Sequence, residues 1–260
     1  MPVMEFVTMQ DPTSSLARLP RGLGAVGLAV FLVLALALFW EVAGGILVKE
    51  VNRALLKRRT RGRLVLTYDD GPGTRLENRV LDLLRQKNVR ATFFLNAKRA
   101  LVHQERVGRL KSAGHEVACH TLEHLDAWRT PPWWIMRDIN QAYAILKDWL
   151  TESGLYRPPY GRITFSTWVR LAARRVHLAF WTWDSRDTWP QLPEPAAIVA
   201  AVRRAGGGVV LMHSFDRDSG DPEQREQYVL ELTARLLELA RQEQWRVCCF
   251  SELMAREAPR

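Results

Sequence analysis

From residue 64 onward, short apolar runs alternate with longer stretches of helical periodicity, and this alternation constrains the fold more than any other feature. Strands that are connected through helices run parallel, because each crossover helix returns the chain to the same edge of the sheet. The predicted strands are Leu64–Tyr68, Ala91–Leu95, His115–Cys119, Leu178–Trp183, Gly208–Met212 and Arg246–Phe250. The predicted helices are Leu76–Gln86, Gln104–Ala113, Trp133–Leu150, Phe165–Arg175 and Glu223–Gln242. The sequence therefore predicts an α/β fold with a parallel sheet.

Polar side chains follow several of these predicted strands directly. They are Asp69 and Asp70 after the first strand, His120 after the third, Asp184 and Asp187 after the fourth, and His213 after the fifth. The carboxyl ends of parallel strands meet at one edge of a sheet, and in such folds the chemistry gathers there. We therefore expect these carboxylates and imidazoles to lie close together.

The N-terminal part carries a run of 19 residues without a charge, Gly22–Trp40. A run of this length suits the hydrocarbon core of a bilayer, which is roughly 30 Å thick. A cleaved signal peptide is the alternative, but its shorter apolar region would end in small residues, whereas this run ends in Leu-Phe-Trp. We predict a tail at residues 1–21, a transmembrane anchor at 22–48, a basic juxtamembrane linker at 49–63 and a globular domain at 64–260.

The net charge of +9 is concentrated before the globular domain. Residues 1–63 hold nine Lys and Arg against four Asp and Glu, whereas residues 64–260 hold 28 against 24. This distribution favours membrane lipid as a partner and argues against nucleic acid. The linker could be a helix lying on anionic headgroups or a solvated basic segment. Its seven basic residues would place the domain on the cytoplasmic side by the positive-inside rule.

Three further patterns carry chemistry, although each alone has an ordinary structural explanation. The segment Thr67–Pro72 (TYDDGP) places two adjacent carboxylates before a sharp turn, which is also typical of a helix cap. His120 and His124 are four residues apart, so that a helical turn would put both on one face, able to hold a zinc-like ion with a carboxylate. Arg157 precedes two prolines, and its guanidinium could hold a carboxylate.

Taken in order, five segments resemble the five motifs of the polysaccharide deacetylase family, also called NodB-homology or carbohydrate esterase family 4. The segments are TYDDGP at 67–72, HTLEH at 120–124, RPPYG at 157–161, DSRDTW at 184–189 and LMH at 211–213. The resemblance covers about residues 60–255. It implies a distorted (β/α) barrel of about seven strands, here preceded by one transmembrane helix, with a metal-assisted deacetylase site.

The resemblance also implies a role for each matching residue. Asp70, His120 and His124 would hold one divalent metal ion, usually zinc, and Asp69 would be the general base, oriented by Arg157. His213 would be the general acid, held by Asp187, and the Tyr160 N–H would stabilise the oxyanion. Leu211 would line the pocket for the acetyl methyl group. Trp189 follows Asp187 by two residues instead of one, so its place in the pocket wall departs from the family pattern.

We therefore predict a membrane-anchored, metal-dependent deacetylase that hydrolyses the acetamide of N-acetylated sugars in a cell-envelope glycan, with an acetylated oligosaccharide or glycan as its partner. One alternative is deacylation of a lipid-linked sugar. Another is a non-catalytic carbohydrate-binding membrane protein on the same scaffold, although binding alone does not require a base at Asp69. The usual glycan substrates of the family favour the extracytoplasmic side, against the positive flank.

Overall fold

The computed structural model describes residues 21–150, 154–216 and 221–255. The predicted N-terminal tail, residues 1–21, lies outside the described residues apart from Arg21. By their contacts the residues divide into two compact units, one up to Trp40 and one from Glu41 onward. The fold described below is that of the second unit.

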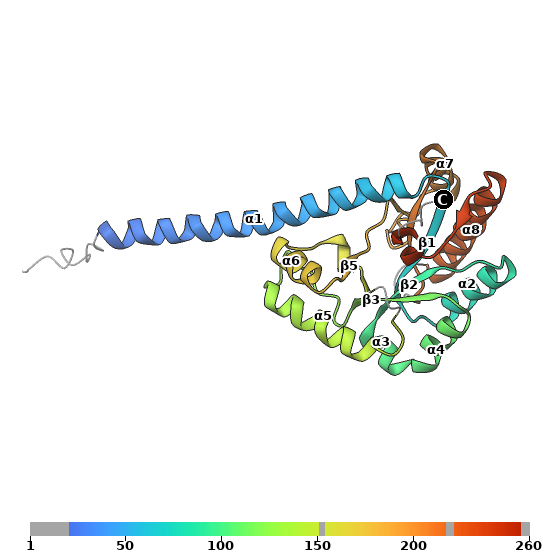
Figure 1. Cartoon of the computed structure of the whole chain (residues 1–260), viewed down its shortest axis with the longest axis horizontal. Coiled ribbons are helices and arrows are strands. Elements are labelled where there is room, and N and C mark those ends of the chain that lie inside the picture. Colours follow the sequence, from blue (N-terminus) through green and yellow to red (C-terminus); the bar gives the residue numbers. More distant parts are fainter. Residues whose placement is uncertain (1–20, 151–153, 217–220, 256–260) are drawn as a thin grey trace, which may run out of the picture. The chain divides into compact units, whose positions relative to one another are not determined.

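A sheet of parallel strands forms a half-barrel in this unit (Figure 1). The strands are β1 (Arg63–Gly71), β2 (Thr92–Asn96), β3 (Glu116–Thr121), β4 (Leu155–Tyr156), β5 (His177–Leu178), β6 (Trp183–Asp184), β7 (Gly207–His213) and β8 (Arg246–Val247). Their order is β5-β4-β3-β2-β1-β7-β6, and β8 pairs with the start of β1. Every strand pair is parallel, which confirms the predicted sheet.

Helices cover the outside of the half-barrel (Figure 1). They are α2 (Arg75–Gln86), α3 (Ala97–Val102), α4 (Gln104–Ser112), α5 (Pro132–Leu146), the 3-10 turn Pro159–Gly161, α6 (Phe165–Ala173), α7 (Pro195–Ala205), α8 (Pro222–Gln242) and α9 (Phe250–Met254). β1 and β7 are neighbouring strands inside the sheet, and their apolar residues are buried because helices cover the sheet. They carry four of the predicted site residues: Asp69, Asp70, Leu211 and His213.

The predicted strand Leu178–Trp183 is wrong as a single element. Its start belongs to β5, which pairs with β4, and its end belongs to β6, which pairs with β7 at the other end of the sheet. Between them the hydrogen-bond partner changes, since the Ala179 N–H donates to Tyr156 O and the Thr182 N–H donates to Val209 O. The apolar segment therefore bridges the two open edges of the half-barrel.

Several other boundaries differ from the predicted ones. β8 contains only Arg246–Val247, and α9 begins at Phe250, inside the stretch predicted as strand. The predicted helix 133–150 ends as α5 at Leu146. β4, α3 and α7 were not predicted, since two-residue and six-residue elements are too short to show a period and α7 is a run of Ala and Val without a clear apolar stripe.

The N-terminal helix α1 (Arg21–Arg59) is long and apolar enough to cross a membrane. Among the described residues it is the one helix with this property, and the side chains from Val26 to Trp40 are exposed. The same helix continues through residues 49–59, for which the sequence left a headgroup helix and a solvated linker open. Leu56 is buried in the second unit, so the helix packs there on the protein.

Candidate active site

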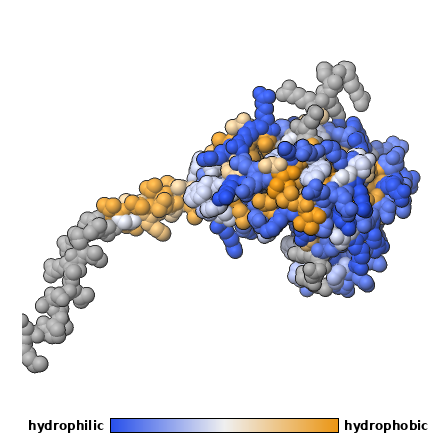
Figure 2. Space-filling model, turned by 90° about the horizontal axis from the view of Figure 1, so that it is seen from below, coloured by the Kyte–Doolittle hydropathy of each residue, from blue (hydrophilic) through white to orange (hydrophobic). Residues whose placement is uncertain are grey.

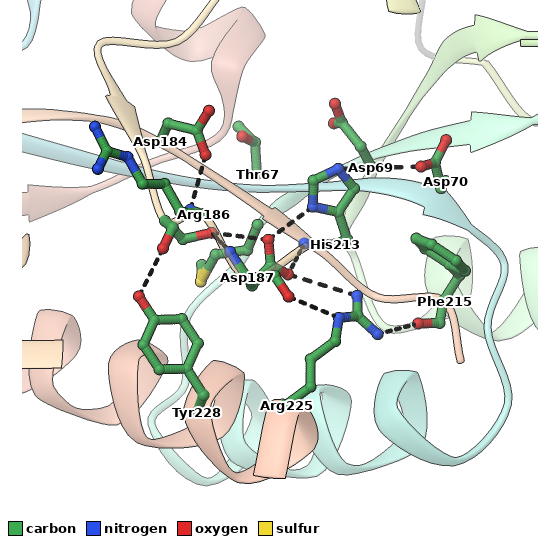
Figure 3. A network of polar contacts seen from close by, with 12 residues as sticks. Thr67, Asp69, Asp70, Asp184, Arg186, Asp187, His213, Phe215, Arg225 and Tyr228 are labelled. Carbon is green, nitrogen blue, oxygen red and sulfur yellow. Dashed lines mark hydrogen bonds and ion pairs between the residues drawn. The ribbon is translucent and has the colours of Figure 1, made fainter. Parts of the chain in front are cut away.

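The polar residues predicted at the strand ends do converge at one edge of the sheet (Figure 3). Asp69 on β1 is in register with His213 on β7 and with Phe94 on β2. Because all strands are parallel, the loops after β3, β4 and β6 reach the same edge. The fold thus gathers groups that are up to 144 residues apart in the sequence.

Asp69 forms a buried ion pair with Arg157. The Arg157 Nη1 donates to Asp69 Oδ1 over 2.7 Å and to Thr67 Oγ1 over 2.8 Å, and its Nε donates to Ala179 O over 2.8 Å. The guanidinium is fully buried and lies 3.9 Å from the centre of the Phe94 ring. Burial lowers the pKa of Arg157, and the charge of Asp69 opposes this effect. The pair fixes the Asp69 carboxylate in one position.

Asp70 faces a different set of partners because the backbone turns at this residue. Its φ is +63°, in the left-handed region, and the register between β1 and β2 shifts between Asp69 and Gly71. Asp70 Oδ1 lies 3.3 Å from His120 Nε2 and 3.4 Å from His124 Nε2. Burial would raise the pKa of Asp70, but its hydrogen bond to His120 and the charges of the surrounding histidines hold it well below the usual value.

The predicted helical turn for the two histidines is wrong. His120 belongs to strand β3, whereas His124 lies in the following loop with φ of +56°. The loop is tied to Asp138 of α5, whose carboxylate accepts from Thr121 Oγ1 and from the Leu122 and Glu123 N–H groups. A strand end and a fixed loop therefore bring both rings to Asp70 without a helix.

Asp70, His120 and His124 form a cluster that fits a metal ion. One ligand atom from each lies within 4.8 Å of the others. The His120 Nδ1 donates to Arg157 O over 2.8 Å, so Nε2, beside Asp70, is the nitrogen left to bind an ion. Two imidazole nitrogens and one carboxylate oxygen match the donor set of catalytic zinc sites.

His213 is held by a fully buried carboxylate (Figure 3). Its Nδ1 donates to Asp187 Oδ1 over 2.8 Å, and its Nε2 lies 4.0 Å from Asp70 Oδ2. Burial lowers the pKa of His213, but the charge and the hydrogen bond of Asp187 raise it to about 9. Asp187 is itself fixed by Ser185 Oγ and by Arg225 Nη2 at 3.5 Å.

The three other predicted site residues surround this edge in different ways. Tyr160 has φ of +57° and packs edge-on against His124, with 4.7 Å between ring centres. Leu211 is buried on β7, in register with Thr67. Trp189 is 54% exposed and stacks with the guanidinium of Arg186 instead of a site residue.

Sequence reasoning missed two buried carboxylates that support the site. Asp138 is described above. Glu77 of α2 accepts hydrogen bonds from the Gly73 N–H, in the loop after β1, and from Ser214 Oγ, directly after β7. Burial raises the pKa of Glu77 to about 7, against these hydrogen bonds. The sequence could have indicated both carboxylates, since each lies on the apolar face of its helix. An acid buried there without a partner would be costly.

Comparisons with known proteins agree with the motifs found in the sequence. The profile of the family described as polysaccharide deacetylase matches residues 57–181. A peptidoglycan-N-acetylglucosamine deacetylase of Bacillus cereus is 31% identical over 194 residues, which cover 74% of this chain and 87% of the relative. A chitooligosaccharide deacetylase of Bradyrhizobium is 32% identical over 177 residues, covering 65% and 80%. A solved peptidoglycan N-acetylglucosamine deacetylase shares the fold with a TM-score of 0.66 at 22% identity, covering 76% of this chain and 91% of the other.

Proposed function

The chain belongs to the polysaccharide deacetylase family, and we propose that it is a membrane-anchored, metal-dependent hydrolase of N-acetylated sugars in a cell-envelope glycan. One observation carries this proposal. A buried carboxylate–guanidinium pair, an Asp-His-His cluster and an Asp-held histidine meet at one edge of the sheet. Amide hydrolysis needs an activated water, a place for the oxyanion and an acid for the amine, and these groups can supply all three.

Asp70, His120 and His124 would hold one divalent ion, for which zinc is the best match to the donors. When bound, such an ion lowers the pKa of a water molecule and polarises a carbonyl oxygen. The hydrogen bond from His120 to Arg157 O supports this assignment, because metal-bound histidines commonly donate their second nitrogen to a backbone carbonyl.

Asp69 would accept the proton of the attacking water. Arg157 donates a hydrogen bond to one oxygen of the Asp69 carboxylate, so the other oxygen is available to accept the proton. The backbone inversion at Asp70 separates this base from the ligand that follows it in the sequence. The two adjacent acids can therefore perform two different tasks.

His213 would protonate the departing amine. Its Nδ1 is used by Asp187, so only Nε2 remains for the substrate, and that nitrogen faces the Asp-His-His cluster. The ring of Tyr160 packs on His124, and the backbone N–H of Tyr160 would stabilise the oxyanion. Leu211 and Trp189 would complete the pocket for the acetyl group and the sugar.

The first part of α1 would anchor the protein in a membrane, with the catalytic domain on the extracytoplasmic side. The length and apolar character of this helix support the anchor. The substrates named for the relatives, peptidoglycan and chitooligosaccharide, support the side of the membrane. A reporter fused after residue 260, active only outside or only inside the cytoplasm, tests the orientation.

The test of the function is acetate release by the full chain in detergent. The protein would be incubated with zinc and either acetylated chito-oligosaccharides or peptidoglycan fragments, beside the Asp69→Asn variant. We expect release by the native protein and loss of release in the variant. Glycan binding without acetate release, at full metal content, would instead support the carbohydrate-binding alternative.

A further inference from the structure

The second half of α1 packs closely on the catalytic domain. A Cβ at Gly45 would lie 1.8 Å from Ile163 O, so the helix backbone touches the loop that follows Tyr160. Glu41 accepts a hydrogen bond from the Ser166 N–H at the start of α6. Further along, Arg53 Nε donates to Trp181 O. This part of the helix is therefore an integral element of the domain.

These contacts also give the direction in which the helix crosses the domain. Ser166 lies just after the loop that follows β4, at the edge that holds the candidate active site. At the other end, the Gly62 N–H donates to Gly206 O, where β1 and β7 begin. The helix thus runs from the strand ends to the strand starts. The chain enters the domain at Glu41, on the active-site edge.

The predicted anchor and the domain overlap on this helix. Residues 41–48 belong to the predicted anchor, yet Glu41, Gly44 and Gly45 contact the domain. The side of the helix turned away from the domain carries a continuous apolar stripe, with Leu47, Val51 and Leu55 each about half exposed or more. Trp40, the last residue of the apolar unit, is followed directly by Glu41, so the chain joins the domain at this edge.

Apart from the stripe on α1, the same edge carries almost all strongly exposed large apolar side chains of the domain. Outside α1, the described residues include seven large apolar side chains that are strongly exposed. Six of them lie in segments that directly follow strand ends, and we call these six the apolar rim: Leu101, Val102, Trp133, Trp134, Tyr160 and Trp189. Figure 2 shows the domain from below: its surface is mostly blue with an orange patch, whereas the described first part of α1 is largely orange.

The opposite end of the domain has a different character. The segments before the strands carry exposed basic side chains, among them Arg61, Arg90, Arg204 and Arg246. Outside α1, whose apolar stripe extends to Leu55, these segments hold no strongly exposed large apolar residue within the described part of the chain. Tryptophan and aliphatic side chains are typical of the membrane interface, whereas a strongly charged surface is typical of contact with water.

We propose that the apolar rim rests on the lipid bilayer and that the active site takes acetylated sugars carried on a lipid. The proposal rests on the proposed function for its chemistry, but the lipid contact follows from the chain's entry point and the rim. A sugar held at the membrane surface would meet the site without leaving the headgroup layer. A soluble glycan that stacks on Trp133 and Trp134 is the competing occupant.

Lipid contact can be measured without an activity assay. In the full chain in nanodiscs, Val102→Cys on the rim and Arg204→Cys at the opposite end would each carry one fluorophore. The native Cys119, Cys248 and Cys249 are buried, so labelling is directed to the new thiol. We expect lipids with a spin label near the headgroup to quench the fluorophore at position 102 and not at position 204. Equal quenching at both positions, or none at 102, would overturn the lipid contact.

Substrate preference is tested with two glycosides of acetylated chitobiose, one with an octadecyl and one with a methyl aglycone. The double variant Trp133→Ser/Trp134→Ser should lose about tenfold in kcat/KM on the octadecyl glycoside, the size of effect expected when two aromatic contacts with lipid are removed. Its rate on the methyl glycoside should be unchanged, as should both rates of the control Arg204→Ser.

The two substrates separate the possible failures. Equal losses on both glycosides would show that the tryptophans bind the sugar. Unchanged rates on both would show that they take no part in substrate binding. Either result overturns the proposal. Absence of acetate release by the native protein from both glycosides would count against the proposed function. The quenching experiment would still decide the lipid contact in that case.

Discussion

Asp69 and Asp70 are neighbours in the sequence, yet they lie in two different environments. Asp69 is 3% exposed and paired with a single buried guanidinium. Asp70 is half-buried and faces three imidazoles, those of His120, His124 and His213. A strand would turn successive side chains to opposite faces, and the left-handed backbone at Asp70 replaces that alternation. One backbone angle thus gives two identical side chains different partners, as their proposed roles of base and ligand require.

The largest expected effect is that of Asp70→Asn. An amide is a weaker ligand than a carboxylate, so the protein should lose bound zinc and about 10⁴-fold in kcat/KM, several kcal/mol of transition-state stabilisation. Metal content measured by mass spectrometry, and partial recovery of the rate in excess zinc, check this expectation. Full metal content in the variant would show that Asp70 is not a metal ligand.

Asp69→Asn is the matched variant one residue away. It should keep its zinc and lose about 10³-fold in kcat, within the usual range for a general base. Added zinc should not restore the rate. If this variant lost its metal as well, the division of tasks between the two carboxylates would be wrong.

Arg157→Met tests the support beneath Asp69. It leaves the Asp69 charge buried without a partner, which should lower the free energy of unfolding by about 3–5 kcal/mol. Denaturant unfolding of the full chain in detergent measures this loss. Arg162→Met is the control, because the Arg162 side chain is 36% exposed and the same charge removal should cost far less there. Similar losses in both variants would contradict the special role of the buried pair.

Glu77 supports the turn that follows Asp70, and its effect depends on pH. The pKa of Glu77 is raised from 4.5 to about 7, so the folded state binds this proton more tightly than the unfolded state. Its contribution to stability is complete below pH 4.5 and is lost as the pH rises through 7. Relative to Glu77→Gln, the native protein should therefore lose about 3 kcal/mol between pH 4.5 and pH 8.

The control for this prediction is Asp82→Asn, which changes an exposed carboxylate on the same helix. Its stability should follow the native protein at every pH. Parallel pH profiles for the native protein and Glu77→Gln would show that Glu77 does not titrate in this range.

Asp138→Asn should have the smallest effect. The amide can replace only part of the three hydrogen bonds that fix the His124 loop, so the affinity for zinc should fall about 10–100-fold, as for other partners of metal ligands. Competition with a chelator measures the affinity. Asp148→Asn, on the exposed surface beyond the same helix, should leave it unchanged.

Much of the fold could be predicted from the sequence because its long elements have clear periods. β7, α2 and α8 lie within one residue of the predicted ranges, and β1 extends three residues beyond its predicted end. The two-residue strands β4, β5 and β6 could not be predicted in this way. β4 is a strand only because it pairs with β3, β5 because it pairs with β4, and β6 because it pairs with β7, and none of these partners lies in the adjacent sequence.

The same difference between local pattern and distant partners holds for the candidate site. Motif order pointed to Asp69, Asp70, His120, His124 and His213, and all five lie at one edge. The spacing of the two histidines suggested a helix, but a strand and a loop fixed by Asp138 position them. Local spacing does not contain that information, because the same four-residue separation fits either geometry.

The sequence by itself determined which segments are apolar, the order of the long strands and helices, and which polar side chains were candidates for the site. Only the tertiary structure decided that Glu77 reaches Ser214 across 137 residues, and that α1 enters the domain beside the candidate active site. The physical reason is the range of the interactions. Periodicity and turn chemistry arise from neighbours along the chain, whereas buried hydrogen bonds and helix packing select partners that only the folded sheet brings together.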